Sequence, residues 1–153
     1  MDVDPLRQED VLHEAQLLSA RLDALSSTVG LLFELRTAMN LMEGNTAVLA
    51  ARGVREFTWS ADEQYIDKTA WNIVGSEPQY LDGIFVLKMA FLPVARMRLV
   101  ATSAAFYVGD VVGLAEQLPD YVEDDEATIA GNLPNWQSVF EPIWATRIDD
   151  SLV

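Results

Sequence analysis

The sequence predicts an α+β fold, in which an N-terminal helix packs on a twisted, mainly antiparallel sheet of five or six strands. Two observations lead to this prediction: an apolar stripe at helical spacing near the start, and an alternation of apolar and polar residues from Val29 onward. The helical and strand patterns are segregated rather than alternating, which disfavours a parallel, doubly wound sheet. The length of 153 residues favours a single domain spanning 1–153.

Residues 4–26 carry the helix prediction. Asp4 suits a helix cap, and Pro5 suits the first helical position. Apolar residues then recur at spacings of four and three, in the order Val11, Ala15, Leu18, Leu22 and Leu25. We expect this stripe to pack on the sheet, and the alternative is a homodimer formed through the N-terminal helix.

The region from Val29 to Trp59 predicts a hairpin. Residues 29–41 alternate as a half-buried strand requires, and Glu43-Gly44-Asn45 has the composition of a turn. The returning strand is expected over 46–59. Gly53 interrupts its alternation and is a candidate β-bulge, because glycine accepts the backbone conformation that a bulge often needs.

Four more segments complete the predicted sheet, at 70–75, 84–92, 96–108 and 138–148. Residues 76–83 have the composition of a loop. Segment 84–92 is apolar on both faces except at Lys88, which indicates a central strand covered on both sides. The predicted core consists of Leu18, Leu22, Phe33, Leu35, Leu87, Met89, Phe91 and Leu99.

Five carboxylates crowd the stretch LPDYVEDDEA, at Asp120, Glu123, Asp124, Asp125 and Glu126. Acidic residues favour the first turn of a helix, and Pro134 would stop a helix that begins there. We therefore expect a short surface helix near residues 123–133, capped by Glu123 or Asp124, with no bound metal.

Three functional interpretations of this acidic stretch stay open. A calcium loop of the helix-loop-helix type is excluded, because it needs glycine at the sixth position, where Asp125 stands. A looser metal site at Asp120 and Asp124, a pair of carboxylates acting as acid and base, and a docking surface for a cationic partner each remain compatible with the sequence.

The composition excludes several functions. The formal net charge of −14 disfavours binding to nucleic acids and anionic membranes, which depends on Lys and Arg. The absence of cysteine excludes disulfides and thiolate metal sites, and His13, the single histidine, cannot form a three-histidine zinc site. No secretory signal, membrane-spanning segment or phosphate-binding glycine motif is recognisable. We expect a soluble cytoplasmic protein without cofactors.

The leading functional prediction is a non-enzymatic acidic binding or accessory protein that acts through protein–protein contacts. Its partner would be a basic protein, as for a neutraliser of a basic toxin or a subunit of an assembly, and the five carboxylates would form the binding surface. The alternative is a small-molecule binder or cofactor-free enzyme with a pocket in the concave face of the sheet. The residues assigned to that pocket are Trp59, Trp71, Tyr107, Asp110 and Arg98.

Three segments resemble uncharacterised actinobacterial proteins: VGLLFELRTA, AAFYVGDV and PDYVEDDEA. No known activity accompanies this resemblance. It implies a bacterial source and a cytoplasmic location, and it assigns no site residue.

Overall fold

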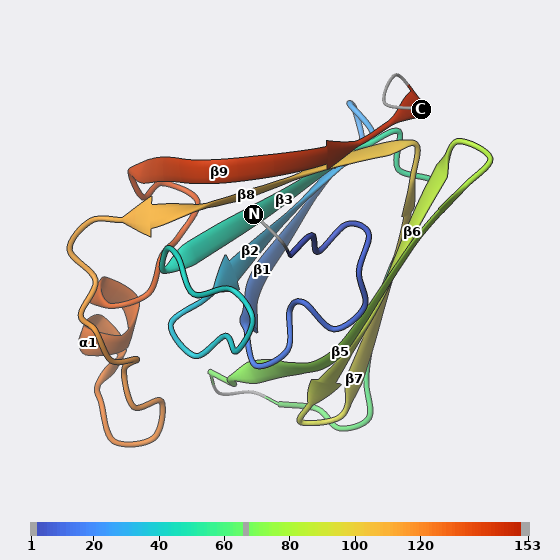
Figure 1. Cartoon of the computed structure of the whole chain (residues 1–153). Coiled ribbons are helices and arrows are strands. Elements are labelled where there is room, and N and C mark those ends of the chain that lie inside the picture. The colour runs from blue at the N-terminus through green and yellow to red at the C-terminus, as the bar shows by residue number, and fades with distance from the viewer. Residues whose placement is uncertain (1–2, 66–67, 151–153) are drawn as a thin grey trace.

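The computed structural model describes residues 3–65 and 68–150, and this part of the chain is almost entirely β-structure (Figure 1). Its strands are β1 (Gln16–Asp23), β2 (Thr28–Glu34), β3 (Thr46–Arg52), β4 (Glu56–Ala61), β5 (Trp71–Leu81), β6 (Ile84–Leu92), β7 (Ala95–Ala101), β8 (Ser103–Val111) and β9 (Phe140–Ile148). Within the described residues, these nine strands form one antiparallel sheet in the order β4-β7-β6-β5-β1-β2-β3-β8-β9. The prediction of an α+β fold with five or six strands is therefore wrong.

The sheet is bent into two halves that meet at an angle (Figure 1). We call them the five-stranded half (β1, β2, β3, β8 and β9) and the four-stranded half (β5, β6, β7 and β4). Strand β3 continues into β4 around Gly53, and β7 continues into β8 around Thr102. The amide of Thr102 donates to the carbonyl oxygens of Arg52, at 3.0 Å, and of Gly53, at 3.2 Å, so the two bends are bonded to each other.

Gly53 is required at this bend for two reasons. Its φ of +63° lies in the left-handed region, and a Cβ atom at this position would lie 2.1 Å from the Thr102 hydroxyl oxygen. The interruption of the alternation at Gly53 therefore marks a corner of the sheet. The predicted strands 46–59 and 96–108 are each divided at this corner, whereas the predicted loop 76–83 belongs largely to β5.

The N-terminal helix prediction is also wrong, because residues 3–15 form a series of turns. Asp10 and Glu14 have positive φ values of 60° and 67°, which a helix cannot accommodate. Their amides instead donate to carbonyl oxygens of β5, Asp10 to Ser76 and Glu14 to Ile73, each at 2.8 Å. The alternative of a homodimer through an N-terminal helix thereby loses its structural basis.

This turn segment fills the space between the two halves of the sheet (Figure 1). Its apolar side chains join the hydrophobic core almost fully buried: Leu6, Val11, Leu12 and Ala15. Later residues of the supposed helical stripe lie instead on β1 and its turn, where Leu22 is 60% and Leu25 98% exposed. The sheet therefore encloses its own N-terminal segment.

The predicted core is confirmed on the strands and wrong on the supposed helix. The confirmed residues are Phe33, Leu35, Leu87, Met89, Phe91 and Leu99, whereas Leu18 and Leu22 are not buried. Strand β6 alternates between buried and exposed positions, so it is covered on one face and not on two as expected. Its outer face, which carries Lys88, stays open to solvent.

Residues 112–139, which we call the excursion, leave the sheet after β8 and return at β9. The excursion contains α1 (Glu126–Gly131), a short helix within the predicted range 123–133 (Figure 1). The Trp136 ring lies over Gly30 of β2, where a Cβ atom would be only 3.1 Å from the ring, and its Nε1 atom donates to the Ser19 hydroxyl at 2.7 Å. The excursion thus packs on the outer face of the five-stranded half.

A buried ion pair fixes the excursion to the sheet. Glu34 is fully buried at the end of β2, and its carboxylate lies 2.7 Å from the guanidinium of Arg36. The same guanidinium donates to the carbonyl oxygens of Ala115 at 2.9 Å and Asn132 at 2.6 Å. One side chain therefore neutralises a buried charge and joins both ends of the excursion to β2.

Within residues 3–65 and 68–150, no helix has the length and apolar character needed to cross a membrane.

We predict that Leu12→Ala lowers the free energy of unfolding by about 2–5 kcal/mol, because it leaves a cavity between the two halves of the sheet. Urea denaturation followed by circular dichroism measures this loss. Leu25→Ala is the matched control, since that side chain is 98% exposed, and it should change stability by less than about 0.5 kcal/mol. Equal effects of the two substitutions would show that the turn segment does not fill the core.

We predict that Arg36→Ala costs about 3–5 kcal/mol of unfolding free energy, because it leaves the Glu34 carboxylate buried without a partner. It should also speed protease cleavage within residues 112–139. Glu34→Gln in the Arg36→Ala background should recover part of the loss by removing the buried charge. The control is Arg55→Ala at an exposed position. A loss below about 1 kcal/mol for Arg36→Ala would contradict the role of this pair.

Candidate functional site

The aromatic residues assigned to a pocket meet only in part. Trp59 and Trp71 lie edge to face with their ring centroids 5.0 Å apart, and Trp59 also contacts Phe91 at 5.0 Å. Tyr65 joins them, 5.4 Å from Trp71. Trp71 packs against the hydrophobic core, so these rings lie at its margin. Trp59 and Trp71 also line a small hollow of about 240 Å³, whose opposite side is formed by residues 17–20 of β1.

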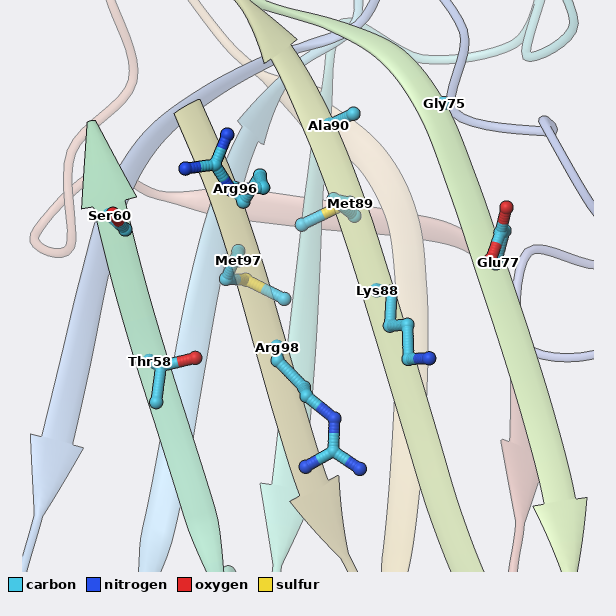
Figure 2. A pocket seen from close by; sticks show the side chains of 10 residues that line it. All are labelled: Thr58, Ser60, Gly75, Glu77, Lys88, Met89, Ala90, Arg96, Met97 and Arg98. Atoms are coloured by element: carbon cyan, nitrogen blue, oxygen red, sulfur yellow. The ribbon is translucent and has the colours of Figure 1, made fainter. Parts of the chain in front are cut away.

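The other three residues of that predicted pocket lie elsewhere. Tyr107 and Asp110 belong to β8, in the other half of the sheet, and Asp110 accepts a hydrogen bond from the Asn45 amide at 3.1 Å. Arg98 lies on the outer face of the four-stranded half (Figure 2). The space between the halves, where the pocket was expected, contains residues 3–15.

Most carboxylates of the acidic stretch accept hydrogen bonds from backbone amides close to them in the sequence. Asp125 caps α1 by accepting from the Thr128 amide at 2.7 Å, so neither of the expected caps, Glu123 and Asp124, is the cap. Asp120 accepts from the Glu123 amide at 3.0 Å, and Asp124 accepts from the Asp120 amide at 2.8 Å. Three of the five carboxylates thus have local structural roles.

The structure also bears on the metal interpretation of this stretch. Within the described part of the chain, no three His, Cys, Asp or Glu side chains come together in an arrangement suited to a metal ion. The carboxylates of Asp120 and Asp124 are instead directed at backbone amides within the stretch.

A groove on the outer face of the four-stranded half gathers basic side chains (Figure 2). It has a volume of about 410 Å³ and is lined by residues of β4, β7, β6 and β5. The strand register places most of the lining residues in two rows across these strands, Thr58-Arg98-Lys88-Glu77 and Ser60-Arg96-Ala90-Gly75. Directly opposed residues in such rows lie about 4.5–5.5 Å apart.

Side-chain size gives this groove its shape. Ala90 and Gly75 have little or no side chain, whereas the residues around them have longer ones. The surface is therefore hollowed above Ala90 and Gly75. In Figure 2 the Arg98 and Lys88 side chains extend toward one end of the strands, and Arg96 extends toward the other. Basic groups therefore flank the hollow at both ends.

The basic side chains of the groove have weak carboxylate partners. Arg98 pairs with Glu56, and Arg96 lies 3.2 Å from Asp62 in a pair that is 62% and 53% exposed. Exposed ion pairs contribute only about 0–1 kcal/mol, so they exchange partners at little cost. Glu77 also lines the groove, opposite Lys88 in the strand register, so the four charged lining residues are three cations and one anion. The groove can therefore offer two guanidinium groups and one ammonium group to an incoming carboxylate beside one resident carboxylate.

Sequence reasoning found these side chains singly but not together. Lys88 interrupts an apolar segment, and Arg96 and Arg98 occupy alternate positions of one strand, which places them on one face. Only the pairing of β6 with β7 sets Lys88 opposite Arg98. The missing signal was therefore the strand order.

We predict that the carboxylates of Asp125 and Asp120 titrate below the ordinary value of 3.8, because backbone amides stabilise their charged forms and so lower both pKa values. Their contribution to the excursion is complete above the unfolded pKa and disappears as the pH falls through the lowered folded pKa. An NMR titration of the Thr128 and Glu123 amides should therefore show midpoints below 3.8. Midpoints at or above that value would contradict the capping geometry.

Comparison with known proteins adds little to this geometry. No family model matches the chain, and no curated protein matches it. Among solved structures, the crystal structure of an uncharacterized protein from Neisseria gonorrhoeae is similar, with 14% identity and a TM-score of 0.48. The match covers 65% of this chain and 97% of that chain. A similarity of this degree supports no functional statement.

Proposed function

We propose that the protein is a non-catalytic binding protein that recognises a partner protein through the groove of the four-stranded half. The observation that carries this proposal is the gathering of Lys88, Arg96 and Arg98 on one face of a chain whose net charge is −14. The partner would have a basic surface from which one Asp or Glu side chain projects into the groove.

The long-range electrostatics favour a basic partner. A net charge of −14 attracts a positively charged protein and increases the rate of encounter, while it repels an acidic one. The acidic stretch contributes to this field, although three of its carboxylates are bound to local amides. We therefore propose that the acidic residues attract the partner over a distance, and that they do not recognise it specifically.

The short-range electrostatics favour a carboxylate in the groove. Binding requires Arg98 and Arg96 to share or leave Glu56 and Asp62, at a cost of about 0–1 kcal/mol for each exposed pair. A hydrogen bond to a charged group contributes about 1.5–3 kcal/mol when the contact is desolvated. The exchange is therefore favourable if the partner covers the groove and excludes water.

A pocket between the two halves of the sheet has less support as the functional site. Leu6 and Leu12 lie there with at most 1% exposure, so the interior is occupied by the chain itself. The small-molecule alternative is left with a hollow at the margin of this interior, such as the one of about 240 Å³ beside Trp59 and Trp71, or with a site on an outer face. The cytoplasmic location expected from the sequence stays a prediction.

We predict that the biotinylated protein captures a basic protein from a bacterial lysate, and that high salt weakens this capture. The double variant Lys88→Gln/Arg98→Gln should reduce the captured amount at least tenfold. Arg55→Gln/Lys68→Gln is the matched control, because it removes the same charge at exposed positions that do not line the groove. Mass spectrometry with isotope-labelled standards measures the captured protein.

Two outcomes would contradict the proposed function. Equal capture by the groove variant and the control variant would show that the groove is not the docking surface. Loss of capture only in Glu123→Gln/Glu126→Gln would show that the acidic stretch is the recognition surface. These two residues suit the test because, among the described residues, the hydrogen bonds from backbone amides to this stretch go to Asp120, Asp124 and Asp125.

A further inference from the structure

The outer face of the five-stranded half carries two adjoining hollows. One has a volume of about 320 Å³ and is lined by Arg52, Ser103 and Arg147, together with small residues. The other, of about 330 Å³, is lined mainly by apolar residues that include Trp136. Tyr107 lines both hollows, so they adjoin on this face. We call the two hollows together the depression, with a basic end and an apolar end.

Small residues form the floor of the depression at its basic end. The strand register aligns one row across four strands of this half, Gly30-Ala50-Ala105-Arg147. Ala50 and Ala105 therefore form the floor next to Arg147, whereas Gly30 lies beneath the Trp136 ring. The side chain of Arg52 enters from the neighbouring row, directly opposite Ser103.

The basic end has unusual electrostatics for this chain. The arginine ion pairs of the described residues involve Arg7, Arg36, Arg96 and Arg98, and neither Arg52 nor Arg147 is among them. Asp149 also lines this hollow, so its charged lining residues are two cations and one anion. The local charge is thus positive by one unit, in a protein whose net charge is −14.

The apolar end is held in place before any ligand arrives. Trp136 is fixed by its hydrogen bond to Ser19 and by Arg21, whose guanidinium lies 5.6 Å from the ring centroid. Leu32 and Val48 lie beside it in the lining. A rigid aromatic wall of this kind loses little conformational entropy on binding.

We propose that this depression binds a small organic carboxylate with an apolar or aromatic body. The carboxylate accepts hydrogen bonds from the guanidinium groups of Arg52 and Arg147, with the Ser103 hydroxyl beside them. The apolar body lies along Tyr107 against Trp136 and Leu32. Each hollow is near the lower limit of the roughly 300–1,000 Å³ found for ligand sites, which suits a ligand of about one or two rings.

The test uses 2-naphthoate as the probe, measured by isothermal titration calorimetry in 150 mM salt. We expect a dissociation constant on the order of 0.1–1 mM, as for a small ligand of modest efficiency. Neutral 2-naphthamide, which has the same shape, should bind at least tenfold more weakly. Arg52→Gln/Arg147→Gln should weaken 2-naphthoate at least tenfold and leave 2-naphthamide unchanged.

Two further variants test the floor of the depression and its independence from the groove of the four-stranded half. Ala105→Leu should weaken both ligands, because it fills the floor on a solvent-facing side where folding tolerates a larger residue. Lys88→Gln/Arg98→Gln should leave 2-naphthoate binding unchanged, because these side chains line the groove and not the depression. Equal affinity for the two ligands, no effect of the arginine variant, or no binding at about 5 mM 2-naphthoate would each overturn the proposal.

Discussion

The buried pair of Glu34 and Arg36 determines what one outer face of the sheet looks like. A carboxylate with no exposure to water is tolerable only when a cation neutralises it, and Arg36 does so while binding carbonyl oxygens of the excursion. The excursion in turn carries Trp136, whose ring closes over Gly30. The aromatic wall of the five-stranded half and the position of the acidic helix therefore both depend on this pair.

The bend at Gly53 and Thr102 determines where binding can occur. The bend places the two halves of the sheet around an interior that Leu6 and Leu12 then fill. A curved antiparallel sheet commonly presents its concave side to a ligand, but here that side has become the hydrophobic core. The centre of the concave side is therefore closed to a ligand. The outer faces offer hollows of their own, in which small residues such as Ala90 and Ala105 leave space between longer side chains.

The sequence placed most core residues of the strands correctly, but it gave the wrong fold class, too few strands and a wrong N-terminal segment, for a physical reason. Alternation is a local property, and it placed Phe33 correctly in the core. The spacing of Val11 and Ala15 fits a helix equally well, but hydrogen bonds from Asp10 and Glu14 to a strand more than 50 positions away decide the outcome. Such long-range partners leave no local signal. The candidate sites could not be predicted for the same reason. The strand order decides which side chains lie next to each arginine, and the sequence does not give the strand order.

The distribution of charge separates two electrostatic functions within one small protein. The acidic residues give the molecule its net charge of −14, and that charge acts over distances of about a Debye length, roughly 8 Å at physiological salt. The arginines and Lys88 act only at contact, where water is excluded and a hydrogen bond to a charge contributes most. A ligand therefore meets an overall negative field but two local basic sites. This arrangement favours partners that combine a positive or neutral exterior with one carboxylate that reaches a basic site. It disfavours polyanions, for which the repulsion from the whole molecule outweighs the attraction to either site.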